Sequence, residues 1–237
     1  MNALYKVVDN AHVALRDLFD GATIMSGGFG LSGGAENCIE AIRDSGKKNL
    51  TIISNNCGNQ GQGLAVLLKN HQIKKVICSF VGGNPDLEEL VLNNAIDIEL
   101  NPQGTLAERI RAGGVGIGGF FTPTGVGTVV AKDKEHRTLN NKNMIFETAL
   151  TADFSILRAH VADTYGNLRF YRTSQNFCPA MAMAGKITIV EAEKIVDFGV
   201  LDPDDIHLPG IFVQRIFLGQ HHKNVIEHKK VRSTNIL

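Results

Sequence analysis

Amide side chains and glycines gather in four short segments, each of which follows an apolar run: GGFGLSGG at 27–34, SNNCG at 54–58, VGGN at 81–84 and NPQGT at 101–105. Asn55, Asn56 and Gln103 supply neutral amide groups. Neutral donors stabilise a carbonyl oxygen that gains negative charge while its carbon is attacked. A single loop amide more often bonds to nearby backbone, but three amides at adjacent strand ends favour a shared site.

The glycines of the first segment, Gly28, Gly30 and Gly33, match the GxGxxG pattern of dinucleotide-binding proteins. Such a site also needs an acidic residue at the end of the following strand to bind a ribose hydroxyl. That strand ends here in SNN at 54–56, which weakens the dinucleotide interpretation. Tight packing of a strand on a helix remains an equal alternative. The bare backbone also suits a long ligand that bears a carbonyl or phosphate.

The first half of the chain alternates strand and helix patterns. We predict strands at 22–28, 49–56, 74–80 and 96–100, and helices at 35–46, 63–70, 84–92 and 105–114. Thr105 and Glu108 have the spacing of a capping box for the last helix, with Gly113 at its C-terminal end. Four strand–helix repeats predict a mostly parallel open sheet with flanking helices, which binds ligands beyond the carboxyl ends of its strands.

The second half has a different pattern. Residues 114–127 contain six glycines and little that could hold a regular element. The sequence of residues 135–147 predicts a hairpin that turns at Asn140–Asn141. We expect strands at 153–160, 167–172 and 186–193, and a short helix at 176–185. The predicted fold class is therefore α/β with an added antiparallel hairpin portion. We expect one domain over residues 1–220 and a polar tail over 221–237.

Composition excludes several classes of protein. Lys plus Arg and Asp plus Glu number 24 each, so the net charge of zero argues against a nucleic-acid partner. The four cysteines show no CxxC spacing and indicate reduced thiols in a cytoplasmic protein. No metal-ligand motif, secretory signal or membrane-length apolar run is present, so we expect no metal and no membrane partner.

Taken together, these motifs resemble the family I coenzyme A transferases, specifically their A-type chain. The signature segment is DGATIMSGGFGLSGGA at 20–35, and the resemblance covers roughly residues 5–220. The segments SNNCG and DDIHLPGIFVQRI are most similar to the succinyl-CoA:3-oxoacid branch. Ala35 and Gly118 stand where the family usually has proline, and Ser26 stands where it has an apolar residue, so looser loops are expected.

The resemblance implies the CoA-transferase fold, coenzyme A as a substrate and no tightly bound cofactor. It implies that CoA lies along Gly27, Gly28, Phe29, Gly30, Leu31, Ser32 and Gly33. Asn55, Asn56 and Gln103 would lie near the reacting carbonyl. The attacking glutamate would belong to a partner B subunit in an A2B2 assembly. The reaction would pass through a glutamyl-CoA intermediate on that glutamate.

Several alternatives remain. The substrates could be those of an acetate/butyrate–acetoacetyl-CoA transferase, and the fold could serve a sugar-phosphate isomerase or an effector-binding module. Three glutamates at or near strand ends are interpreted as structural: Glu99, Glu191 and Glu193. The only Glu-Asn pair, Glu36–Asn37, falls inside a predicted helix. Phe29 either contacts the ligand or, as we favour, plugs the turn.

Overall fold

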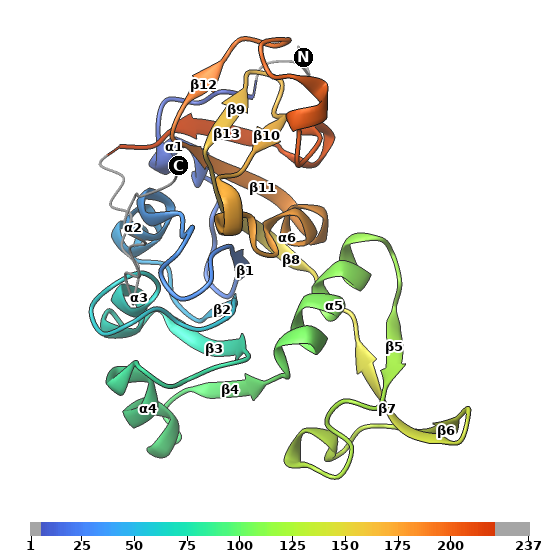
Figure 1. Ribbon diagram of the computed structural model, residues 1–237. Helices are drawn as coiled ribbons and strands as arrows, with labels where there is room; N and C mark the ends of the chain where they lie inside the picture. Colours follow the sequence, from blue (N-terminus) through green and yellow to red (C-terminus); the bar gives the residue numbers. More distant parts are fainter. Residues whose placement is uncertain (1–5, 221–237) are drawn as a thin grey trace, which may run out of the picture.

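The computed structural model describes residues 6–220 as an α/β fold around a parallel sheet of seven strands (Figure 1). The strand order is β13-β11-β8-β1-β2-β3-β4, and all the pairs are parallel. The strands are β1 (Thr23–Ser26), β2 (Leu50–Ile53), β3 (Ile73–Cys78), β4 (Asp97–Leu100), β8 (Ala152–Ala159), β11 (Gly185–Ala192) and β13 (Arg215–Leu218).

The path of the chain reverses at β1. Strands β2, β3 and β4 add successively on one side of β1, and the chain then returns to place β8 on the other side. This point of reversal opens a crevice at the carboxyl ends of β1 and β8, where open α/β sheets bind ligands. The second half thus contributes three parallel strands in addition to its hairpin.

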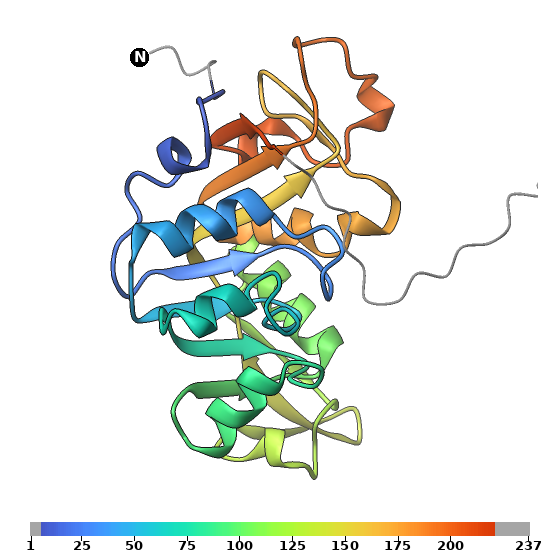
Figure 2. The same ribbon diagram turned by 90° about the vertical axis from the view of Figure 1, so that its left-hand side faces the viewer.

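Helices cover both faces of the sheet. They are α1 (Ala11–Ala14), α2 (Glu36–Ser45), α3 (Ala65–Lys69), α4 (Pro85–Leu92), α5 (Gln103–Gly114) and α6 (Cys178–Ala184). Figure 2 shows α2, α3 and α4 stacked across one face. Because side chains alternate along a strand, Ile24 and Ile52 pack in the core under these helices. Met25 and Ile53 pack in the opposite core, which includes Leu106 of α5.

Two smaller sheets flank the central one. The first is antiparallel and contains β5 (Gly119–Thr122), β6 (His136–Leu139) and β7 (Lys142–Thr148), in the order β5-β7-β6. The second contains β9 (Val161–Asp163), β10 (Leu168–Arg169) and β12 (Ile195–Val196), in the order β10-β9-β12. Short 3-10 turns lie at Val129–Ala131, Arg172–Gln175, Pro203–Asp205 and Gly210–Phe212.

The predicted hairpin is confirmed. Asn140 and Asn141 have φ angles of 51° and 59°, the left-handed conformation that a two-residue turn between right-twisted strands requires. The predicted helix at 84–92 is also confirmed, since the Asn84 side chain accepts the N–H of Leu87 and Pro85 occupies the first turn.

Two local predictions are wrong. Helix α5 begins at Gln103 after Pro102, so Thr105 lies inside the helix and forms no capping box with Glu108. Gly113 is likewise helical, and it has no room for a side chain because a Cβ there would lie 1.9 Å from the carbonyl oxygen of Leu150. The glycine-rich stretch 114–127 is not irregular throughout, because it contains β5.

The prediction of one domain over 1–220 with a separate tail stays a prediction, and the tail, 221–237, lies outside the described residues. None of the helices within 6–220 has the length and hydropathy that crossing a bilayer requires.

Candidate active site

Three polar side chains meet at the carboxyl edge of the sheet: Asn55 after β2, Ser79 after β3 and Gln103 in the first turn of α5. Asn55 Nδ2 donates to Gln103 Oε1 at 2.9 Å and lies 3.1 Å from Ser79 Oγ. Ser79 Oγ donates to Gln103 Oε1 and also lies 3.1 Å from the Asn55 carbonyl oxygen. We call Asn55, Ser79 and Gln103 the amide cluster.

The glycine loop after β1 contacts this cluster through its backbone. The N–H of Gly30 donates to Asn55 Oδ1 at 3.1 Å. Gly30 has a φ angle of 60°, which glycine adopts without strain. The loop therefore joins the amide cluster through a backbone donor and not through a side chain.

Two of the three amide side chains that were predicted to share a site lie together, and the third does not. Asn55 and Gln103 lie together, whereas Asn56 is buried and its Oδ1 accepts the N–H of Gly58 at 3.4 Å. Ser79 was not predicted as a site residue. A signal for it existed, because the parallel pairing of Ile53 with Ile77 brings residues two positions further along, Asn55 and Ser79, side by side.

The glycines at 27 and 33 are required by packing within the chain. A Cβ at Gly27 would lie 2.6 Å from the sulfur of Cys178, and one at Gly33 would lie 2.8 Å from the carbonyl oxygen of Ser174. Phe29 is 51% exposed, so the favoured interpretation of this residue as an apolar plug is wrong. A contact with a ligand stays a prediction.

A pocket of about 540 Å³ lies where the carboxyl ends of β1, β8 and β11 meet. Its lining comprises Leu31, Ser32 and Gly33 of the glycine loop, Arg158, Ala159 and His160 at the end of β8, the segment 171–174, and Glu193. The pocket occupies the crevice expected at the reversal of strand order. Three of the residues predicted to lie along CoA therefore face a cavity large enough for part of such a ligand.

Three titratable side chains of this pocket, Arg158, His160 and Glu193, contact one another. Arg158 Nε and Nη2 donate to Glu193 Oε1 at 3.0 and 2.6 Å, and His160 Nδ1 lies 2.8 Å from Glu193 Oε2. Burial acts to raise the pKa of Glu193, but the bonds from His160 and Arg158 outweigh it, so the pKa lies below its usual value. Glu193 therefore stays ionised and is held by both neighbouring side chains.

Glu99, which lies on the other side of the amide cluster from this pocket, is also an ionised carboxylate paired with two side chains. Lys75 Nζ and Arg109 Nη1 approach its carboxylate at 2.6 and 2.7 Å. Burial acts to raise its pKa, and the bonds from Lys75 and Arg109 lower it to below the usual value. This pairing supports the structural interpretation of Glu99.

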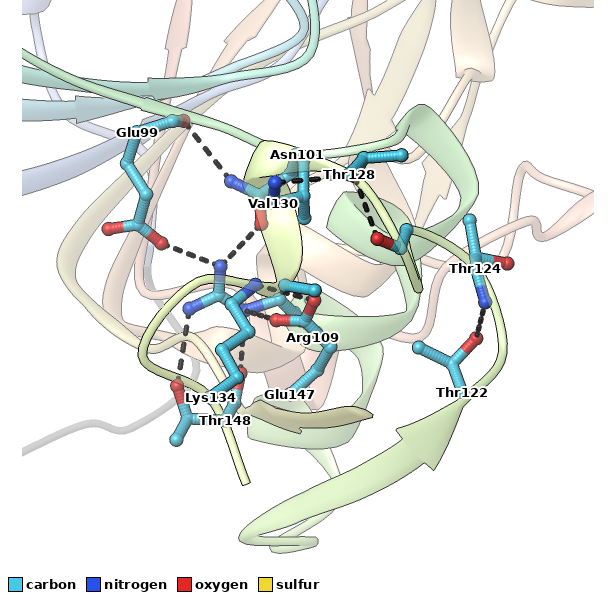
Figure 3. A network of polar contacts seen from close by, with 12 residues as sticks. Glu99, Asn101, Arg109, Thr122, Thr124, Thr128, Val130, Lys134, Glu147 and Thr148 are labelled. Carbon is cyan, nitrogen blue, oxygen red and sulfur yellow. Dashed lines mark hydrogen bonds and ion pairs between the residues drawn. The ribbon is translucent and has the colours of Figure 1, made fainter. Parts of the chain in front are cut away.

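A network around Arg109 supports the helix that carries Gln103 (Figure 3). Arg109 Nη1 donates to Asn101 Oδ1 at 2.5 Å, and its Nε donates to the carbonyl oxygen of Thr148 at 2.7 Å. Glu147 lies 3.9 Å from Arg109 Nε and accepts a bond of 2.6 Å from Lys134. The network joins the end of β4, helix α5 and strand β7.

The cysteines offer no nucleophile. Cys38, Cys57, Cys78 and Cys178 are all buried and free. Burial raises the pKa of Cys78 to about 11 and that of Cys178 to about 12. Because the thiolate is the reactive form, these thiols are inert at neutral pH. Within 6–220, no group of three or more His, Cys, Asp or Glu side chains could hold a metal ion.

Comparison with known proteins identifies the relatives of the chain. A family model for coenzyme A transferase matches residues 8–219. The chain is 51% identical over 230 residues to the A chain of the probable succinyl-CoA:3-ketoacid coenzyme A transferase of Bacillus subtilis, with 97% of each chain covered. It is 50% identical to the A chain of the succinyl-CoA:3-ketoacid coenzyme A transferase of Helicobacter pylori strain J99, covering 96% of this chain and 98% of that one.

A solved structure has the same fold. The acyl-CoA transferase of Escherichia coli O157:H7, in a thioester complex with CoA, superposes with a TM-score of 0.85 at 23% sequence identity. The match covers 98% of this chain and 53% of that one, so the present chain spans about half of the solved protein. The predicted fold class is therefore confirmed.

Proposed function

Because the chain belongs to the coenzyme A transferase family, we propose that it is the A-type chain of a succinyl-CoA:3-ketoacid CoA transferase. Relatives that match it over nearly their full length carry this name, that of Bacillus subtilis with the word probable, and the branch agrees with the segments SNNCG and DDIHLPGIFVQRI. Family membership leaves the isomerase and effector-binding alternatives without support.

The observation that carries the proposal is an amide cluster without a carboxylate at the carboxyl edge of the sheet. Gln103 is half-buried, and its Nε2 donates to no atom among the described residues. A thioester carbonyl oxygen placed beside this amide would be stabilised as it gains charge. The cluster therefore fits a site that activates an acyl group and leaves the attack to another group.

The attacking group is a glutamate of the partner B subunit. Its carboxylate attacks the thioester carbon of succinyl-CoA and expels the CoA thiolate, which leaves a mixed anhydride. The thiolate then attacks the glutamyl carbonyl of the anhydride, which forms glutamyl-CoA and releases succinate. The carboxylate of the 3-oxoacid repeats these steps in reverse, takes the CoA and regenerates the glutamate.

The surroundings of the three glutamates at or near strand ends support that division. Glu99 and Glu193 are held by cations, and Glu191 is fully buried against the start of α2. A nucleophile needs an exposed, unengaged oxygen in reach of the substrate. None of these three carboxylates meets that requirement.

CoA would lie along the glycine loop, Gly27–Gly33, with its remote parts available to position the thioester. Asn56 would border the site without contacting the acyl group, since its side chain bonds within its own loop. The active assembly would contain two A and two B chains. Four buried free thiols suit a reducing compartment such as the cytoplasm.

The first test is a transfer assay with succinyl-CoA and acetoacetate, run on the purified chain, on a B-type chain and on the two combined. We expect transfer only by the combination. Acetate and butyrate, offered as alternative acceptors, separate this branch from the acetoacetyl-CoA transferases of shorter acids. Transfer by the chain alone, or none by the complex with any of these acids, would contradict the proposal.

A further inference from the structure

We propose that Gly30, Asn55 and Ser79 form a hydrogen-bond relay that fixes the orientation of the Gln103 carboxamide and so presents its N–H groups to the substrate. This inference rests on the proposed function, because that function depends on the Gln103 amide as a donor and the relay determines where this donor points. Asn55 and Ser79 are then positioning residues, and Gln103 alone contacts the reacting carbonyl.

A backbone N–H group determines which atoms of the relay donate and which accept. The amide ends of Asn and Gln have similar shapes, and only their bonding partners determine which atom is oxygen and which is nitrogen. A backbone N–H can only donate. Since the N–H of Gly30 points at the Asn55 side chain at 3.1 Å, the Asn55 atom facing it must be the oxygen, Oδ1.

The remaining orientations follow from this one. With Oδ1 facing Gly30, Asn55 Nδ2 faces Gln103 at 2.9 Å, and a donor there requires the oxygen of Gln103. The Ser79 hydroxyl lies 3.1 Å from Asn55 Nδ2 and also donates to Gln103 Oε1. Both neighbours therefore hold the Gln103 oxygen inward, and Nε2 is left on the outer side.

Burial distinguishes the positioning residues from the contacting one. Asn55 is 5% exposed, and both of its polar side-chain atoms are engaged within the relay. Gln103 is more exposed, and within residues 6–220 only its oxygen is engaged. A substrate carbonyl can thus reach the Gln103 amide without displacing a bond that holds the cluster together.

The test is a double-mutant cycle with Ser79→Ala and Gln103→Ala in the complex with the B chain, assayed with succinyl-CoA and acetoacetate. Gln103→Ala should lower kcat roughly 100- to 1,000-fold, the usual effect of removing such a donor. Ser79→Ala should lower kcat and kcat/KM for succinyl-CoA together by roughly 5- to 20-fold, as expected for one lost orienting bond. In the Gln103→Ala background it should change either constant by less than about 2-fold.

A second variant tests the direction of the relay without changing its shape. In Asn55→Asp, one carboxylate oxygen still accepts from Gly30, but the other repels Gln103 Oε1 and attracts Nε2 inward. We expect kcat to fall almost as far as in Gln103→Ala, while the melting temperature of the complex stays within a few degrees of the wild type. Ser45→Ala is the matched control for Ser79→Ala. Among the described residues, the Ser45 hydroxyl bonds only to the carbonyl oxygen of Ile42 and to the N–H of Lys47, at the end of α2.

The outcomes separate the two proposals. Additive losses in the cycle, or full activity in both Ser79→Ala and Asn55→Asp, would overturn the relay while an active wild-type complex still supported the proposed function. A wild-type complex inactive with succinyl-CoA and acetoacetate would overturn both.

Discussion

At the residue scale, Glu191 is a buried acid held by a helix terminus. Its Oε2 accepts the N–H groups of Asn37 and Cys38 at 2.8 and 3.3 Å. Burial raises the pKa of Glu191 to about 7, although these two N–H groups and nearby Arg158 favour its charged form. The folded chain therefore keeps a proton on Glu191 that the unfolded chain releases near pH 4.5, the ordinary value for Glu.

This difference predicts how stability depends on pH. Between about pH 4.5 and 7 the folded state binds more protons than the unfolded state, so this group's contribution to stability falls as pH rises. Glu191→Gln carries no charge at any pH. The free energy of unfolding of this variant should therefore rise relative to the wild type by up to roughly 3 kcal/mol from pH 5 to pH 8, as measured by urea unfolding.

Glu99→Gln is the control. The pKa of Glu99 is lowered, so its stabilising contribution is complete above the unfolded value and is lost only as pH falls through the folded value. Its difference from the wild type should stay constant between pH 5 and 8. A constant difference for Glu191→Gln over the same range would show that Glu191 is charged in the fold.

Residue types along the chain predicted an amide-rich site, but they did not predict which of its side chains contact one another. Asn55 and Asn56 are identical in type and adjacent in sequence, yet one contacts Gln103 and the other its own loop. Successive residues of an extended chain point in different directions, and only the sheet determines which direction faces the site. Ser79 was missed because its role depends on the register between β2 and β3.

At the element scale, helix α5 links the amide cluster to the small sheet β5-β7-β6. Gln103 lies in its first turn, and Arg109 lies further along, where it contacts the end of β4 and the backbone of β7 (Figure 3). Arg109 is 5% exposed, and its bonds are to Glu99, Asn101 and Thr148. The position of the Gln103 turn is therefore tied to the packing of a neighbouring sheet.

Arg109→Met should destabilise the chain by roughly 2–4 kcal/mol, because it leaves the acceptors of Asn101 and Thr148 without their donor, while Lys75 and Lys134 still pair with Glu99 and Glu147. Arg111→Met, two positions away in the same helix, removes a surface pair with Glu108 and should change stability by less than about 1 kcal/mol. Urea unfolding of both variants measures the contrast. Equal losses would contradict the assignment of a structural role to the Arg109 network.

Local sequence signals predicted most elements but gave a wrong start for α5. The hairpin at Asn140–Asn141 and the helix after Asn84 were predicted because each depends on neighbouring residues. The start of α5 was misplaced because Pro102, whose carbonyl oxygen accepts the N–H of Leu106 at 2.9 Å, begins the helix before the apparent capping box. Strand β5 was missed because its partner, β7, lies on the far side of a loop.

At the scale of the whole molecule, the sheet brings the functional loops together by its strand order. Repeated strand and helix patterns predicted a parallel sheet for the first half. They did not predict that β8, β11 and β13 extend the same sheet on the other side of β1, because pairing across such long connections leaves no local pattern. The reversal at β1 places the glycine loop between the amide cluster and the pocket at the end of β8.

The division of work between two chains is tested most directly by locating the covalent intermediate. The complex with the B chain is incubated with succinyl-CoA without an acceptor acid, and the intact mass of each chain is then measured. We expect a CoA adduct on a glutamate of the B chain and an unchanged mass for the present chain. A CoA or succinyl adduct on the present chain, at Glu99, Glu191, Glu193 or any other residue, would contradict this account.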